Sequence, residues 1–100
     1  NNNAVLIAEL IADYHKSVLE VGDEITETFH SENWQRLGEL AHTLKSSSFS
    51  VGAMIVGELC ARLETAGKEG NEFVIRETVP VFDQAVKELV EALLVQGGKK

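Results

Sequence analysis

The sequence predicts an all-α protein, an antiparallel up-down four-helix bundle that occupies residues 1–100 as a single domain. Apolar residues recur every three or four positions in four separate stretches, which is the period of an amphipathic helix. Short segments rich in glycine, serine or asparagine separate these stretches, and no stretch shows the alternation of a strand. A chain of 100 residues has room for one hydrophobic core. We therefore expect each helix to bury one face against the others.

The first predicted helix covers residues 4–29, and its apolar stripe consists of Leu6, Leu10, Tyr14, Val21, Ile25 and Phe29. Gly22 weakens a helix interior by about 1 kcal/mol relative to alanine. The periodicity nevertheless continues through Gly22, so we expect one long helix. His30 and Ser31 end it, and Ser31 is the predicted N-cap of the next helix.

The second helix is predicted over residues 32–49, with Leu37, Leu40 and Leu44 inward and Gly52 in a left-handed conformation after its end. The third is predicted over residues 53–66. Gly67 should end it, and its buried residues are Ile55, Val56, Leu59, Leu63 and Ala66.

The last helix is predicted to begin after an Asn71 N-cap and to run to about Gln96. Its stripe consists of Ile75, Phe82, Val86, Leu89 and Leu93. Pro80 interrupts this pattern and should bend the helix or divide it at the preceding residue. Pro80 falls opposite Phe82, so we expect it to face solvent.

Composition excludes several classes of protein. The net charge of −7 and the scattered lysines and arginines argue against nucleic-acid binding. No apolar run is long enough to span a membrane. Cys60 is the only cysteine, so no internal disulfide can form, and we expect a cytoplasmic location. The chain starts NNNAV without Met, which we interpret as the mark either of a domain from a longer chain or of trimming by processing.

His42 is the most informative residue of the sequence. At about 100° per residue it falls on the side of its helix opposite the leucines, so we expect it to face solvent. The outer face of this helix, around His42, should include Gln35, Gly38, Lys45, Ser46 and Phe49. A histidine on such a face is usually only a surface residue, but Gly38 and Ser46 are small enough to let a large partner approach. Phe49 either belongs to this face or packs under the loop at Val51.

Neutral imidazole suits reversible phosphoryl capture, because a ring nitrogen lone pair attacks phosphorus without a separate base. Lys45, one turn after His42, supplies a cation that would attract an anionic donor and offset the charge of a phosphorylated ring. Taken alone, Lys45 would be read as a solvated charge.

The run Ala41-His42-Thr43-Leu44-Lys45, followed by small residues and Val51-Gly52-Ala53, closely resembles the signature of histidine-containing phosphotransfer (HPt) domains of multistep two-component relays. The likeness covers essentially the whole chain. It continues through the positions Leu59, Cys60, Leu63 and Glu64, and upstream through Phe29, Asn33, Trp34 and Leu37.

The resemblance implies a four-helix bundle whose exposed histidine takes a phosphoryl group from an aspartyl phosphate on one receiver domain and passes it to an aspartate on another. His42 matches the phosphorylated residue and Lys45 the neighbouring cation. Ser46 stands where the family most often has glycine, so its hydroxymethyl group either crowds docking or donates a hydrogen bond to a phosphoryl oxygen. We expect Gln35, Gly38 and Phe49 to take part in docking.

Further expectations follow from this resemblance. The partners would be receiver domains of a response regulator or of a hybrid sensor kinase, and the domain would be a monomer, either free or part of a membrane-anchored kinase. Mg²⁺ would sit on the receiver, and this domain would bind no cofactor. No Gly-rich phosphate loop or Walker-type lysine is present, so we expect no ATP-dependent kinase activity of its own.

Two alternatives remain open at this point. An ATP-binding histidine kinase domain could phosphorylate His42 directly, or the bundle could bind a partner without transferring phosphate. A metal site is not expected, because the spacing of the histidines at 15, 30 and 42 and of Cys60 lacks the local pairs of a zinc site. His15 and His30 are read as surface residues, and Cys60 as a small core residue.

Overall fold

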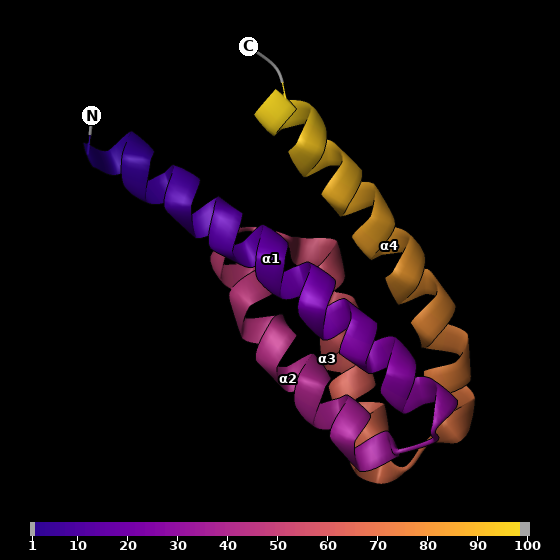
Figure 1. Ribbon diagram of the computed structural model, residues 1–100. Coiled ribbons are helices and arrows are strands. Elements are labelled where there is room, and N and C mark those ends of the chain that lie inside the picture. The colour runs from indigo at the N-terminus through magenta and orange to yellow at the C-terminus, as the bar shows by residue number, and fades with distance from the viewer. Residues whose placement is uncertain (1, 99–100) are drawn as a thin grey trace.

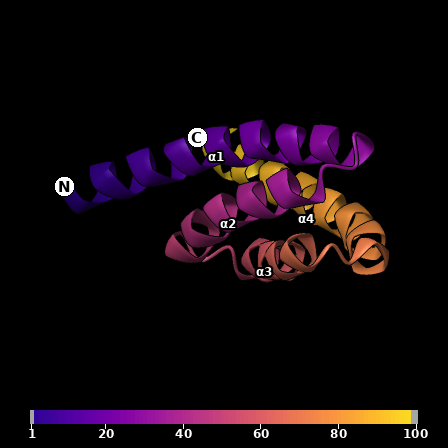
Figure 2. The ribbon, with the colours of Figure 1, turned by 90° about the horizontal axis from the view of Figure 1, so that it is seen from below.

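The computed structural model describes the backbone of residues 2–98 and the side chains of residues 3–93. These residues form four α-helices: α1 (Asn2–His30), α2 (Trp34–Ser50), α3 (Met54–Glu69) and α4 (Glu72–Gly98). The helices run up and down in chain order and are joined by short loops, as Figures 1 and 2 show. The predicted all-α four-helix architecture is therefore confirmed. The molecule is elongated, with principal extents of 46 × 20 × 18 Å.

The core is built from the inward stripes of all four helices. The largest fully buried side chains include Phe82 of α4, Ile25 of α1, Leu37 and Leu44 of α2, and Leu63 of α3. Burying a side chain of this size contributes about 1.5–3 kcal/mol to the free energy of folding. The stability of the bundle therefore comes from packing these stripes together, because isolated helices of such sequences are marginal in water.

One buried polar pair joins α1 to α2 inside this core. The hydroxyl groups of Tyr14 and Ser48 lie 2.7 Å apart, and both side chains are buried. One hydroxyl donates a hydrogen bond to the other, which offsets the cost of burying the two polar groups. Desolvation raises the pKa of Tyr14.

Two predicted helix ends are wrong by a few residues. The N-cap of α2 is Asn33, whose side-chain oxygen accepts a hydrogen bond from the backbone N–H of Arg36, whereas Ser31 donates to the carbonyl of Thr28. α3 does not stop at Gly67 but continues to Glu69, and Gly70 closes it with a φ of 65°. The predicted left-handed Gly52 and the Asn71 N-cap are confirmed.

Gly67 has a packing role in place of the predicted stop. A Cβ atom at Gly67 would lie 2.7 Å from the carbonyl oxygen of Trp34 and 2.8 Å from the Cα of Gly38. Real Cβ atoms do not approach backbone atoms this closely, so only glycine fits. The pair Gly38 and Gly67 therefore brings the backbones of α2 and α3 into direct contact.

The N-terminal part of α1 extends past α2 and α3 (Figures 1 and 2). Leu6 and Leu10, predicted in the buried stripe, are 61% and 49% exposed. The apolar period is present, but α2 and α3 end before this segment, and α4 diverges from it (Figure 1). Ile55, predicted as buried in the third helix, is 70% exposed because it lies in the first turn of α3 at the end of the bundle.

Pro80 does not divide the last helix. α4 continues through it, and Pro80 is exposed while Phe82 is fully buried, as predicted. The axis of α4 curves over its N-terminal half (Figure 1). This agrees with the expected bend around the core. Among the described residues, no helix is both long and apolar enough to cross a membrane.

Candidate functional site

The side chain of His42 is 61% exposed on α2, at the seam between α2 and α3. Its neighbours Leu40, Ala41 and Leu44 are buried. The helical period therefore holds His42 outside the core, and its predicted exposure is confirmed.

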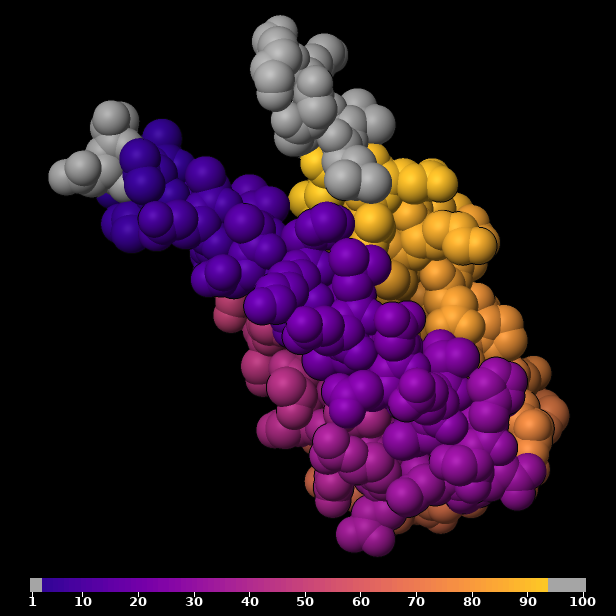
Figure 3. Space-filling model, viewed as in Figure 1, coloured from indigo at the N-terminus to yellow at the C-terminus, as the bar shows by residue number. Residues whose placement is uncertain are grey.

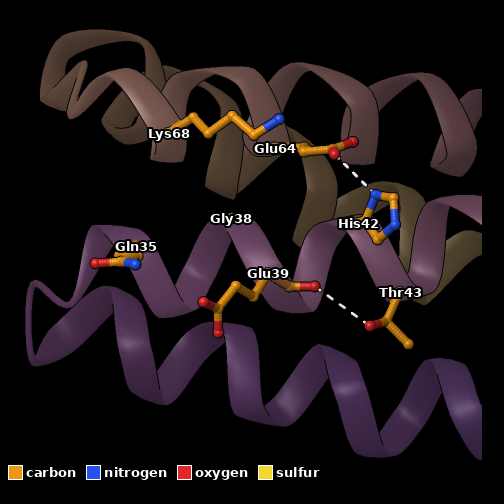
Figure 4. Close-up of a pocket in the computed structure, with 7 residues that line it drawn as sticks. All are labelled: Gln35, Gly38, Glu39, His42, Thr43, Glu64 and Lys68. Carbon is orange, nitrogen blue, oxygen red and sulfur yellow. Dashed lines mark hydrogen bonds and ion pairs between the residues drawn. The ribbon is translucent and has the colours of Figure 1, made fainter.

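Glu64 of α3 faces His42 across this seam. The Nδ1 atom of His42 lies 2.8 Å from Oε2 of Glu64 (Figure 4). The contact follows from the glycine pair, because His42 lies one turn after Gly38 on α2 and Glu64 lies one turn before Gly67 on α3. In antiparallel helices these two positions come together on the same side of the contact.

Lys45 holds the other oxygen of the same carboxylate. Its Nζ atom lies 2.7 Å from Oε1 of Glu64, and the Glu64 side chain is only 15% exposed. The hydrogen bond from Lys45, together with a smaller contribution from His42, lowers the pKa of Glu64 even though burial acts in the opposite direction. Glu64 is thus a carboxylate with two specific partners, and Lys45 is more than a solvated surface charge.

This arrangement selects one tautomer of His42. An ionised carboxylate only accepts hydrogen bonds, so Nδ1 must carry the proton that Glu64 accepts. In a neutral ring the other nitrogen, Nε2, then carries the lone pair. The side chain therefore presents a nucleophilic nitrogen while its second nitrogen is fixed by a charge-assisted hydrogen bond.

A hollow of about 500 Å³ opens beside the ring (Figure 4). It is lined by residues of α2 and α3, namely Gln35, Gly38, Glu39, His42, Thr43, Glu64 and Lys68. The hydroxyl of Thr43 donates to the carbonyl of Glu39, so it is engaged with its own helix. Lys68 is exposed and places a second cation on the α3 side of the hollow.

Gly38 does not lie on the outer face of α2, contrary to the prediction. It is buried, and a Cβ atom there would lie 3.3 Å from the carbonyl oxygen of Glu64 and from the Cα of Gly67. Gly38 borders the hollow from this buried position. Gln35 is exposed, as predicted, and lines the same hollow.

Phe49 and Ser46 lie further along α2. Phe49 is 38% exposed, and its ring covers Gly57 of α3, where a Cβ atom would come within 2.6 Å of Cε1. The ring thus packs on α3, and Phe49 stays partly exposed. Ser46 is exposed one turn after His42.

The remaining candidate groups lie apart from this site. Cys60 is fully buried, and burial, followed by the charge of Glu64, raises its pKa to about 12. Its thiol is therefore protonated at neutral pH. His15 is half-buried and His30 is exposed. Within the part of the chain that the structure describes, no three His, Cys, Asp or Glu side chains gather in a way that could hold a metal ion.

Glu64 was expected only as a position of the family likeness, with no role at the site, and Lys68 was not expected there. Glu64 follows His42 by 22 positions and lies on another helix, so no local spacing links the two residues. The signal that could have found Glu64 is its place beside the buried Leu63 on the face of α3 that packs on α2. That inference requires knowing which helices are neighbours.

Comparison with family models gives a match over residues 9–95 to the model described as Hpt domain. This match includes His42 and all of α2 and α3. Comparisons with curated proteins and with solved structures gave no match.

Proposed function

Because the chain belongs to the Hpt domain family, the phosphotransfer modules of two-component signalling, we propose that it is a relay intermediate that carries a phosphoryl group on His42. The group would come from an aspartyl phosphate on one receiver domain and pass to an aspartate of a response regulator. The observation that carries the proposal is the exposed His42 ring, whose Nδ1 is bonded to Glu64 and whose Nε2 is thereby left as the nucleophile.

The proposed step needs no base. The Nε2 lone pair attacks phosphorus, the bond between phosphorus and the aspartyl oxygen breaks, and the aspartate leaves as a carboxylate. The ring becomes positively charged, and the carboxylate of Glu64 stabilises this charge through the Nδ1 proton. Transfer to the next aspartate is the reverse of these events.

Lys45 and Lys68 would contribute charge to the same step. Lys45 is bound to the same carboxylate as His42, and Lys68 lines the hollow beside the ring, so both add positive charge near the place where an anionic donor would dock. Mg²⁺ and the acidic residues that bind it would belong to the receiver domain, as in phosphoryl transfer generally. The role of this domain is to position one nitrogen and to present a docking face.

The docking face in this proposal surrounds the hollow beside His42. Gln35 lies in its wall, Ser46 follows one turn later, and the exposed edge of Phe49 extends the face along α2. The partners would be receiver domains of a response regulator or a hybrid sensor kinase, and the exchange would occur in the cytoplasm. The domain would act there as a monomer.

The test is phosphoryl uptake from a phosphorylated receiver in the presence of Mg²⁺. Wild-type protein should gain a phosphate that is labile in acid and stable in base, and His42→Gln should gain none. A label that persists in His42→Gln would overturn the site assignment. Uptake only when an ATP-binding kinase domain replaces the receiver would show a kinase-linked module, and partner binding without uptake from either donor would show an interaction module.

A further inference from the structure

A second hollow lies between α1 and α4, on the opposite side of the bundle from the seam that holds His42. It is a groove of about 410 Å³ whose apolar floor is formed by Val18 of α1 and by Phe82, Val86 and Val90 of α4, and the exposed Leu19 of α1 also lines it. Figure 3 shows α1 and α4 side by side along this edge. The α1 residues span 18–26 and the α4 residues 82–91, so the groove is long enough for about two turns of a helix.

Gly22 lies in the wall of this groove, and neither close packing nor a positive φ angle requires a glycine at this position. Gly38, Gly57 and Gly67 each meet a neighbour that a Cβ atom would crowd, and Gly52 and Gly70 have positive φ angles. Gly22 has neither reason, because a Cβ atom there would meet nothing within 4 Å. Yet glycine in a helix interior costs about 0.5–1 kcal/mol relative to alanine. Close approach of an outside group to α1 would account for this glycine.

The rim of the groove is acidic. Asp23 of α1 and Asp83 and Glu91 of α4 lie along it, and Lys87 is the one cation among its lining residues. Desolvation raises the pKa of Asp83, although His30 and Lys87 act against this shift. A carboxylate that has lost part of its hydration is stabilised by a cation brought next to it.

We propose that the groove between α1 and α4 binds an amphipathic helix with a basic face, supplied by a partner protein. Apolar side chains of that helix would cover the floor, its backbone would approach α1 at Gly22, and its lysines or arginines would pair with the acidic rim. This is a binding site separate from His42 and independent of the proposed phosphoryl transfer.

A second copy of this chain does not fit the same groove. The exposed apolar segment of α1, residues 4–13, carries Glu9 and Asp13 and no basic residue. The acidic rim would repel it, and the net charge of −7 opposes association of two copies at low salt. Charge complementarity therefore favours a basic partner.

The test uses a fluorescein-labelled helical peptide of about 18 residues, five turns, built from leucine and lysine, and a counterpart with glutamate in place of lysine. Anisotropy titration of the wild-type protein should give saturable binding of the basic peptide that weakens as salt is raised. Gly22→Leu should weaken this binding by about tenfold or more, which corresponds to about 1.4 kcal/mol. Gly22→Ala should weaken binding by a smaller factor, between wild type and Gly22→Leu, because one methyl group obstructs the approach to α1 less than a leucine side chain does.

A second pair of variants tests the rim. Asp23→Asn combined with Asp83→Asn should weaken binding and reduce its salt dependence, whereas Glu58→Gln, on the surface of α3, should change neither. Amide chemical shifts in the complex should move along the groove. No saturable binding by wild type, equal binding of the acidic peptide, equal binding by Gly22→Leu, or shifts centred on His42 would each overturn the proposal.

Self-association would also overturn it. A wild-type dimer in sedimentation equilibrium that Gly22→Leu abolishes would assign the groove to a second copy. Phosphoryl uptake at His42, measured on Gly22→Leu in parallel, should equal wild type. A failure of uptake in the wild-type protein would count against the proposed function and leave the peptide result unaffected.

Discussion

Oε2 of Glu64 lies 2.8 Å from Nδ1 of His42, and these two atoms connect α3 to the exposed face of α2. The same carboxylate holds Lys45 at 2.7 Å through its other oxygen. A single acidic side chain therefore sets both the tautomer of the histidine and the position of the neighbouring cation.

Glu64→Ala should slow phosphoryl uptake by His42 about tenfold, since charge-assisted hydrogen bonds are worth about 1.5–3 kcal/mol and each 1.4 kcal/mol is a factor of ten in rate. Glu64→Gln keeps an acceptor for the Nδ1 proton and should recover part of the loss. Single-turnover transfer from a phosphorylated receiver measures both rates. Equal rates in wild type and Glu64→Ala, at equal circular dichroism, would show that Glu64 does not position the ring.

The glycine contact between α2 and α3 should be intolerant of a methyl group. Gly67→Ala should destabilise the fold by about 1–3 kcal/mol, because its Cβ would meet the backbone of Trp34 and Gly38, which cannot rotate away. Gly22→Ala should stabilise it by about 0.5–1 kcal/mol, because the same change there meets open space. Urea denaturation of the two variants and of wild type measures both changes in the free energy of unfolding. A Gly67→Ala variant as stable as wild type would contradict the close contact.

Stability should depend on pH through Glu64. Its pKa is lower in the folded protein than in the unfolded chain, where a glutamate has a pKa of about 4.3. The ion pairs of Glu64 thus contribute fully above that pH and are lost as the pH falls through the lowered folded pKa. The difference in free energy of unfolding between wild type and Glu64→Gln should be largest near neutral pH and should shrink in acid. A difference that stays constant from neutral pH into acid would show that the network adds nothing.

Cys60 should be inert in the folded protein. Its pKa is raised to about 12, and its side chain is fully buried, so the reactive thiolate is both rare and inaccessible. Alkylation by iodoacetamide at pH 8 should be undetectable without denaturant and complete in urea. Mass spectrometry of the intact chain measures both, and rapid labelling in buffer would contradict the packing of α3.

The sequence by itself determined the features that depend on neighbouring positions along the chain. Apolar periodicity predicted four helices, and the angular position of His42 around its helix predicted its exposure. Local turn chemistry predicted the left-handed Gly52 and the Asn71 N-cap. These features follow from backbone geometry and side-chain spacing within one helix, which the order of residues contains directly.

Only the tertiary structure decided which helices touch and how far they overlap. Gly67 was predicted to end a helix and Gly38 to lie on the surface, but the two residues form the contact between α2 and α3. That contact places Glu64 beside His42. Leu6 and Leu10 share the apolar period of Ile25 but stay exposed, because α1 extends beyond α2 and α3 and diverges from α4 (Figure 1). Periodicity specifies which face of a helix is apolar. Burial of that face requires a second helix packed against it at the same position along the bundle, and the packing depends on contacts between residues far apart in the chain.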